Sequence, residues 1–596
     1  MDPRKGGVRK RLGIDTPAVP LEASSASSDG RRGSVRQRVG TPDMTGTDKI
    51  DGPLLANLKA KWGKGKLSAK DIESLATSAT AQGADRLPDF SSPAYPQNLQ
   101  RSLIAKFGKP KGAPDFFWAA IPTKVGTVLH PFLLPHDWMA SLVRYKIFWE
   151  KHVVGRATAA SEFWENMKDT EYFKAHPHLY EHELHRTIPL GFHGDGGAFN
   201  KNDSLMVYSM NSLVGTGTTR QTRFVLTILP KSIMCEGTTE TVMQILAWSF
   251  NVCLTGVQPE NDWNGTPLGP TTKRSYIADG YRFAFCQIRG DWEFFTFLLN
   301  LPKWNMADRM CWLCHASGQT DSPLSYGRVD ANAPWRATRV THESYMADLE
   351  NRGVDAPALA RYLVGFNICI VMVDVLHCVD LGISAHILGN VFAACLQLQI
   401  WGTNKQANID GLDKAIKKWY SETKATNKIN GKLTADRIQT SKMWPKLKVK
   451  GAAARGIIGF ALKLATEHLD SNHVLIMRLL ARFVELLDSE GMFLSESART
   501  ELPQLGMRLC KTYTTLARQA LGERRKAWKP SPKLHMFQHL CEWQSLIFNP
   551  RFSWCYSDED LVGQLIDVAE SCHSKTLAST AMFKWLTLVY DEFVPQ

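Results

Sequence analysis

The sequence IPLGFHGDGGAF, residues 188–199, is the most informative stretch of this chain. It is an apolar segment that ends in an acid, Asp195, set among glycines. Two further apolar runs, residues 205–213 and 223–231, follow it at the distance expected of hairpins. Strands of this composition, separated by turn residues, predict an antiparallel meander.

A helix and a fourth strand are predicted next. Residues 238–257 have helical spacing of apolar side chains, and residues 281–288 return to a strand pattern that ends just before Asp291. Three antiparallel strands, a crossover helix and a fourth strand form the opening of an RNase H-like fold. We therefore expect an α/β (α+β) chain with a mixed sheet at its core.

The size and charge of the chain limit its possible functions. With 596 residues, of which 44% are hydrophobic, it should form two or three folded units and a tail. The net charge of +13 suggests a polyanionic partner, most simply nucleic acid. Residues 1–112 hold 20 Lys+Arg and 11 Asp+Glu, so that +9 of this charge belongs to the N-terminal part.

Twelve cysteines lie mostly in apolar segments, which indicates buried, reduced thiols in a cytosolic or nuclear protein. The sequence shows neither an uncharged apolar run long enough to span a membrane nor a secretory signal, and we expect neither.

The chain is predicted to have six parts. Near the N-terminus, the basic runs at residues 4–11 and 31–38 suit nuclear import or phosphate contact, or are simply a solvated tail. The parts are a disordered basic tail (1–53), a helix with a Pro-rich linker (54–134), a helical platform (135–185), the core with a Cys-x2-Cys element (186–401), an all-helical insertion (402–530) and a closing segment (531–596). Within the core, residues 366–374 predict a fifth strand that also ends in an acid, Asp374.

The order of these motifs resembles the RNase H-like DDE transposases of the CACTA and Kyakuja-Dileera-Zisupton (KDZ) type. The matching motifs are His193-Gly-Asp195-Gly, Gly290-Asp291, Cys311-x2-Cys314, Asp374-x2-His377 and Pro532-Lys-x-His535, followed by an acid on the closing helix. One departure is the context of the second acid, which is Arg-Gly-Asp-Trp-Glu rather than Cys-Asp-Ala. The resemblance implies a nuclear enzyme that cuts DNA and joins strands at two Mg²⁺ or Mn²⁺ ions.

In that chemistry carboxylates from separate strands hold the ions. We expect Asp195 to bridge both ions, Asp291 to hold one and Glu559 the other, with Asp374 and Asp560 as second-line acids. Each acid has a structural alternative: an Asx turn for Asp195, a helix N-cap for Asp291 and a first-turn acid that complements the helix dipole for Glu559.

Cys311 and Cys314 have the spacing of half a structural zinc site. We expect the other ligands to come from His315, His342, Cys369, His377 or Cys378, with His377 as the assigned one. Two reduced thiols without metal, or a redox pair, are the alternatives. His535 and His539 share a helix face, where packing is the more common role.

Nucleic-acid contacts are expected in residues 405–455, which hold 13 Lys+Arg against 4 Asp+Glu. A solvated face of Lys-rich helices is the alternative. The candidate residues, with two arginines beside the core hairpin, are Arg220, Arg223, Lys417, Lys418, Lys446, Lys448 and Lys450.

Three functions compete. The first is an active transposase whose partner is DNA, and the second is a catalytically inactive, domesticated descendant that only binds nucleic acid. The third is a protein-interaction scaffold. For the first two we expect neither a membrane nor a small-molecule cofactor, and a homo-oligomer stays open.

Overall fold

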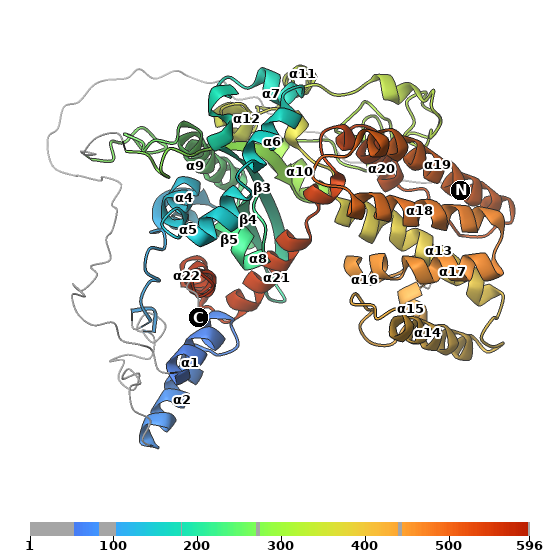
Figure 1. Ribbon diagram of the computed structural model, residues 1–596, viewed down its shortest axis with the longest axis horizontal. Coiled ribbons are helices and arrows are strands. Elements are labelled where there is room, and N and C mark those ends of the chain that lie inside the picture. Colours follow the sequence, from blue (N-terminus) through green and yellow to red (C-terminus); the bar gives the residue numbers. More distant parts are fainter. Residues whose placement is uncertain are drawn as a thin grey trace, which may run out of the picture.

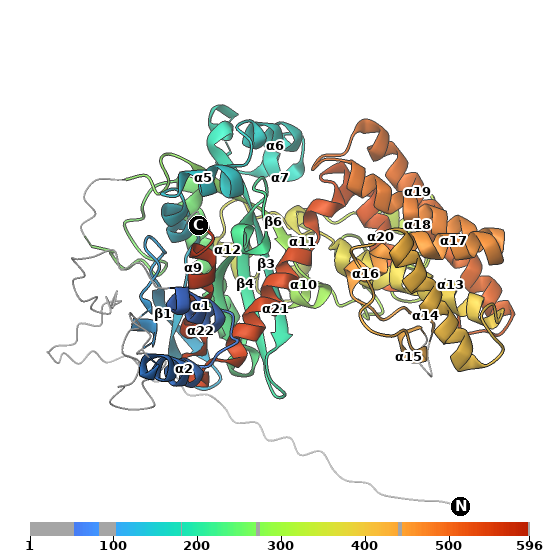
Figure 2. The same ribbon diagram turned by 60° about the horizontal axis from the view of Figure 1, so that its bottom comes forward.

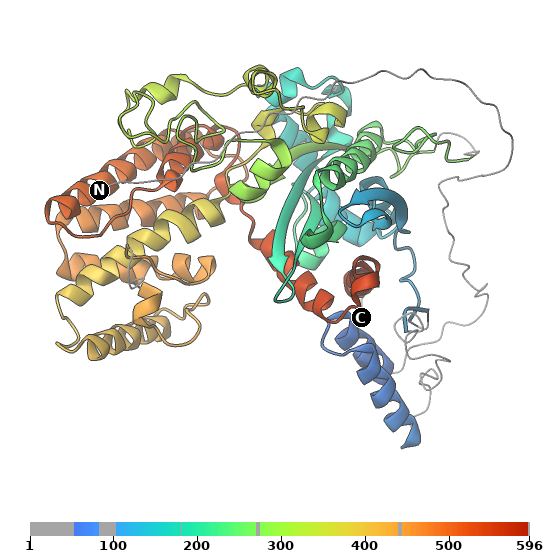
Figure 3. The ribbon, with the colours of Figure 1, turned by 180° about the vertical axis from the view of Figure 1, so that it is seen from behind.

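The computed structural model describes residues 53–82, 103–105, 107–179, 181–269, 275–438 and 444–593 (Figure 1). It has a part built on a small sheet and a part built of helices, with the segment before α21 at their junction (Figures 1 and 3). The basic runs at residues 4–11 and 31–38, like most of the predicted tail, lie outside the described residues.

The central sheet has four strands in the order β5-β4-β3-β6. These are β3 (Thr187–Ala198), β4 (Ser204–Ser212), β5 (Phe224–Pro230) and β6 (Arg282–Arg289). β4 pairs antiparallel with both β3 and β5, while β6 pairs parallel with β3. The predicted meander and the mixed α/β class are therefore confirmed.

The predicted fifth strand is reduced to one bridge. Val371 forms a single parallel bridge to Ile288 of β6, after a short 3-10 turn, Ile368–Ile370. The backbone of Val373 pairs with a side chain instead of a strand: its N–H donates to Gln544 Oε1 (2.7 Å) and its carbonyl accepts from Gln544 Nε2 (3.1 Å). The prediction of a full strand over 366–374 is wrong because a glutamine amide takes the place of the neighbouring strand.

Helices cover both faces of the sheet (Figure 2). On one face α9 (Glu236–Thr255) packs Phe250 against Phe192 of β3 and Phe285 of β6. On the other lie α21 (Tyr556–Glu570), α22 (Leu577–Tyr590) and the short α8 (Thr219–Thr222). A Cβ on Gly197 would lie 2.2 Å from Ile566 Cδ1, so the glycine allows α21 to lie directly on β3.

The N-terminal region departs from the prediction of one helix and a linker over residues 54–134. It contains α1 (Pro53–Gly63), α2 (Ala69–Ala81) and a hairpin of β1 (Phe117–Thr123) and β2 (Gly126–Phe132). The linker was predicted from proline content, but a two-stranded hairpin tolerates proline at positions whose N–H is not needed for pairing.

The helices predicted as a platform pack on the sheet. They are α4 (Pro135–Leu142), α5 (Lys146–Trp149), α6 (Ala159–Met167) and α7 (Glu171–Ala175). The Trp138 indole donates to the Val225 carbonyl (2.9 Å), and the Trp164 indole donates to the Thr187 carbonyl (2.7 Å). Because both rings are buried, these bonds anchor the helices to β5 and β3.

His130 makes the fold sensitive to acid. Its Nε2 lies 2.7 Å from Thr227 Oγ1, and burial lowers its pKa to about 4. Because the folded pKa is below the unfolded one, the unfolded chain binds the extra proton, and stability falls as pH drops from about 6.5 towards 4. We expect His130 to contribute roughly 2 kcal/mol of the stability lost between about pH 7 and pH 5. Denaturant unfolding of wild type and His130→Gln at both pH values checks this. Between about pH 7 and pH 5 the free energy of unfolding should fall less in the variant than in wild type.

The helical part contains α13 to α20. These are α13 (Ser384–Gln397), α14 (Lys405–Glu422), α15 (Ala435–Ile438), α16 (Gly451–Gly456), α17 (Ile458–His468), α18 (Ser471–Ser489), α19 (Glu496–Gly522) and α20 (Pro532–Glu542). α13 packs on α17 and α18, and α20 packs on α19, so the packed helices extend beyond the predicted range 402–530.

Three helices and one π-helical turn join the sheet to the helical part. They are α10 (Trp292–Leu299), α11 (His342–Asn351), α12 (Ala358–Tyr362) and the turn Leu376–Ile383 that leads into α13. The continuous stretch Leu376–Gln397 is long and apolar enough to cross a membrane, but 78% of its apolar 18-residue window is buried inside the protein. It therefore forms a core helix of this fold.

Candidate functional site

Asp195 lies within strand β3 and not in a turn. It pairs with Val207 of β4, and the strand continues to Ala198. Its flanking glycine, Gly194, is required by packing: a Cβ there would lie 2.3 Å from the Phe294 ring of α10. The Asx-turn alternative is therefore wrong, and the glycines let α10 and α21 approach the strand on either side of the acid.

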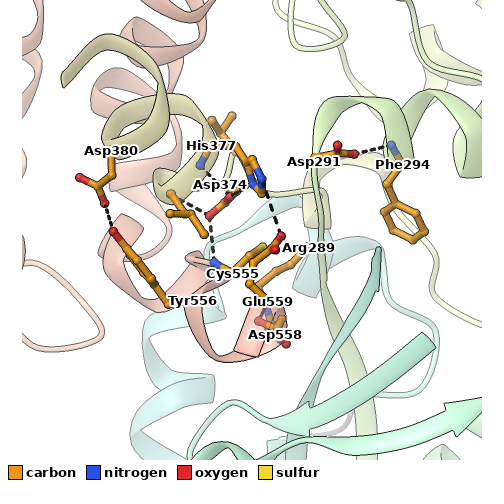
Figure 4. Close-up of polar contacts among 12 residues, drawn as sticks. Arg289, Asp291, Phe294, Asp374, His377, Asp380, Cys555, Tyr556, Asp558 and Glu559 are labelled. Atoms are coloured by element: carbon orange, nitrogen blue, oxygen red, sulfur yellow. Dashed lines mark hydrogen bonds and ion pairs between the residues drawn. The ribbon is translucent and has the colours of Figure 1, made fainter. Parts of the chain in front are cut away.

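Three consecutive acids at the start of α21 point in three directions, because successive helical residues are about 100° apart. Asp558 faces the sheet and is fully buried, while Glu559 is half-buried (Figure 4). Asp560 is exposed and accepts a hydrogen bond from Gln564 Nε2 (2.9 Å). As a second-line catalytic acid, Asp560 is therefore badly placed.

Asp558 is held by two arginines. Arg223 Nε donates to Oδ1 (2.7 Å), and Arg289 Nη2 donates to the same oxygen (3.0 Å). Although burial opposes ionisation, these guanidiniums hold the pKa of Asp558 far below its usual range. Arg223 is thus a buried ion-pair partner, which corrects its prediction as a nucleic-acid contact. Arg289 belongs to the same ion network, although the sequence alone does not identify it as a site residue.

Glu559 faces a second carboxylate and an imidazole. Burial and the neighbouring charge of Asp195 raise the pKa of Glu559 to about 8, against the opposing effect of His377. The distance from His377 Nε2 to Glu559 Oε1 is 3.7 Å. Acids on β3 and α21, more than 300 residues apart in the sequence, therefore share one site.

Asp374 is hydrogen-bonded to His377 and to the start of α21 next to this site (Figure 4). Its Oδ1 accepts from the backbone N–H of Leu376 and of Cys555, both at 2.9 Å. Its Oδ2 accepts from the His377 N–H (2.9 Å) and lies 2.6 Å from His377 Nδ1. With both oxygens in use, Asp374 is poorly suited to hold a metal, and it instead ties the start of the π-helical turn to the start of α21.

His377 is oriented by Asp374, which binds Nδ1 and leaves Nε2 towards Glu559. Although burial opposes protonation, Asp374, Glu559 and Asp291 raise the pKa of His377 to about 9. The ring thus lies between Asp374 and Glu559 and outside the group formed by Cys311 and Cys314, which corrects its prediction as a zinc ligand.

Asp291 is the N-cap of α10. Its Oδ1 accepts a hydrogen bond from the Phe294 N–H (2.7 Å), as the structural alternative proposed (Figure 4). Its charge still acts on His377 and on Lys533. Asp291 thus lies at the edge of the acidic site, with one oxygen committed to the helix.

A second cluster consists of Cys311, Cys314, His535 and His539, which are all buried. Their ligand atoms lie within 4.8 Å of one another, so that the group could hold a metal ion. Cys314 Sγ is 3.2 Å from His535 Nε2, and the two Nε2 atoms are 2.9 Å apart. Burial, and the neighbouring His535, lower the pKa of His539 to about 4, which leaves a neutral imidazole able to ligate.

The histidine pair corrects the predicted ligand set. His315, His342, Cys369, His377 and Cys378 are absent from the group that the described residues form. The usable signal was the i, i+4 spacing of His535 and His539, which places both rings on one face of α20. Packing is nevertheless the more common role of two histidines on one helix face, and Trp335 does pack on both rings.

The predicted nucleic-acid contacts divide into two groups. Arg220 is occupied by Gln564 (2.9 Å) and Glu592 (3.5 Å), while Lys417 and Lys418 are exposed but paired along α14 with Asp413 and Glu422. Lys446 is half-buried, and Lys448 and Lys450 are exposed.

Comparison of the chain with protein-family models, and with curated proteins, finds no match.

Proposed function

We propose that the protein is a metal-dependent nuclease that cuts and joins DNA, of the DDE transposase type, with Asp195, Asp291 and Glu559 as its acids. The observation that carries the proposal is the meeting of Asp195 and Glu559, which β3 and α21 supply from distant parts of the sequence. The strand order β5-β4-β3-β6, with β6 parallel to β3, supports an RNase H-like core.

The donor set suits Mg²⁺ or Mn²⁺, because these ions prefer carboxylate oxygens. Asp195, Glu559 and the remaining oxygen of Asp291 would hold the metal. When bound, such ions activate an attacking hydroxyl and stabilise the leaving oxygen of a phosphodiester.

The protein's own contribution is the position of Glu559. Arg223 and Arg289 donate hydrogen bonds to the preceding residue, Asp558. Asp374 accepts a hydrogen bond from the Cys555 N–H at the start of the same helix. The first turn of α21 is therefore held from two sides, and the Glu559 carboxylate is directed at Asp195 and His377.

We further propose that the cysteine and histidine cluster binds structural zinc. Two thiolates and two imidazoles are the ligand set of closed tetrahedral zinc sites. Here they join the loop after α10 to α20, and therefore join the element that begins at Asp291 to the helical part.

Nicking of supercoiled plasmid in the presence of Mg²⁺ or Mn²⁺ tests the nuclease. We expect Asp195→Asn and Glu559→Gln each to lower the rate on the order of 1,000-fold, since each replaces a carboxyl ligand of the metal site by an uncharged amide. Asp560→Asn is the matched control on the neighbouring helical position and should nick at the wild-type rate. Equal rates in all four proteins would contradict the proposal.

A second candidate is the catalytically inactive descendant that only binds nucleic acid. The helix-capping contact of Asp291 favours it, because one oxygen of this acid already has a structural role. Wild-type protein that shifts DNA in a gel but does not nick it with either metal would support this candidate.

A further inference from the structure

Two separate segments bring lysines to one side of the helix that follows the acidic site. The segment at 445–447 packs on α13, where the Leu447 N–H donates to the Ala385 carbonyl (2.8 Å). The segment at 528–533 packs there as well, and the Trp528 N–H donates to Asn390 Oδ1 (2.9 Å). Both segments come from beyond α13 in the sequence and carry Lys446, Lys529 and Lys533.

Glycines allow this close approach. A Cβ on Gly389 would lie 2.5 Å from Lys446 Cα, and a Cβ on Gly382 would lie 2.8 Å from Lys533 Cδ. Trp528 adopts a left-handed backbone (φ 58°), which is costly for a large side chain and needs strong support. The support is its burial against His473 and Tyr513, and the next residue, Lys529, is exposed.

The lysines act on one another. His386 lies at the start of α13, and its Nδ1 is 3.3 Å from the Pro445 carbonyl. Besides burial, the charges of Lys446, Lys529 and Lys533 lower the pKa of His386. Besides burial, the charges of Lys533, Lys448 and Lys529 lower the pKa of Lys446. We call His386, Lys446, Lys529 and Lys533 the lysine cluster.

The lysine cluster lacks acidic partners at ion-pair distance in the described parts of the chain. By contrast, Lys417, Lys418 and Lys432 of the same helical part each pair with an aspartate or glutamate. Cations gathered without direct ion-pair partners repel one another, and a bound polyanion would relieve this repulsion.

Lys533 links the cluster to the acidic site. Its Nζ donates to the His377 carbonyl (2.6 Å), and it lies within the influence of Asp374 and Asp291. The lysine cluster therefore begins beside the acids, along the π-helical turn and the first part of α13, with Lys529 exposed and Lys446 and Lys533 half-buried.

We propose that the lysine cluster binds the phosphates of the DNA strand that enters the acidic site. This inference rests on the proposed partner, DNA, and adds the surface that receives it. Lys533 lies nearest the acids, so that phosphates bound at Lys446, Lys529 and Lys533 would place a following phosphodiester of the same strand at Asp195 and Glu559.

Binding of labelled single-stranded and duplex oligonucleotides, measured without added divalent metal on the Asp195→Asn background, tests the lysine cluster without cleavage and leaves the zinc centre loaded. We expect the triple variant Lys446→Gln, Lys529→Gln, Lys533→Gln to bind roughly 30-fold more weakly and to lower the salt slope by roughly 2 to 3. The triple variant Lys417→Gln, Lys418→Gln, Lys432→Gln is the control, because it removes the same charge from paired lysines. If the first triple variant loses more affinity for single-stranded than for duplex oligonucleotides, the bound strand is unpaired. The opposite result shows that it is part of a duplex.

Equal loss in the two triple variants would overturn the inference. If the first triple variant does not fold, as judged by circular dichroism, the pair Lys446→Gln and Lys529→Gln replaces it with the same comparison. If the wild-type protein nicks DNA but the first triple variant binds DNA as tightly as wild type, the inference about the lysine cluster is overturned and the nuclease proposal stands. Selective loss of binding in a protein that never nicks would overturn the nuclease and retain the DNA surface.

Discussion

Asp558→Asn should lower the free energy of unfolding by about 3 to 5 kcal/mol, the range measured when one partner of a buried ion pair is removed. The substitution keeps the shape of the side chain but leaves Arg223 and Arg289 without a negative charge. Arg289 is only 1% exposed, so that water cannot replace the lost partner. Guanidinium chloride unfolding, followed by tryptophan fluorescence, measures the change.

Asp560→Asn provides the control for this prediction, because it is the same substitution two positions along the helix at an exposed site. It should change stability by less than about 0.5 kcal/mol. The pKa of Asp558 is lowered in the folded state, so its contribution is present above the unfolded value of about 4 and is lost as pH falls below it. A similar loss in both variants, or none in Asp558→Asn, would show that the ion network does not hold α21.

The sheet could be predicted from the sequence because its strands are long and apolar and are separated by turn residues, which is a local signal. The fifth strand could not, because the Gln544 side chain that satisfies Val373 comes from far along the chain. The hairpin β1–β2 also gave no strand signal, because it contains prolines and β2 does not alternate but runs from exposed to buried residues.

The acidic site was partly predictable for a related reason. The sequence shows locally that an acid follows β6 and that acids begin α21. Which of the three consecutive acids on α21 enters the site depends on the direction in which each side chain leaves the helix. Arg289 settles that choice by binding Asp558, and a buried arginine at the end of an apolar strand is a signal that sequence patterns rarely reveal. The role of Asp374 is likewise decided by four backbone and side-chain donors that meet only in the folded protein.

The protein, purified without chelator, should contain about one zinc ion per chain, because four buried ligands within 4.8 Å of one another form a closed site. Cys314→Ser and His539→Ala should each lose the metal. The loss should lower stability by about 4 kcal/mol where free zinc exceeds its Kd by about 1,000-fold. Elemental analysis gives the zinc content, and thermal unfolding with and without EDTA gives the stability.

His315→Ala is the matched control for the zinc centre, since this histidine follows Cys314 directly but is exposed and outside the cluster. It should retain zinc and unfold as wild type does. Because the cluster joins the loop after α10 to α20, metal loss should also loosen the position of Asp291 against α21 and slow Mg²⁺-dependent nicking. Wild-type protein that is free of zinc and unaffected by EDTA in thermal unfolding would leave Cys311 and Cys314 as two reduced thiols beside His535 and His539.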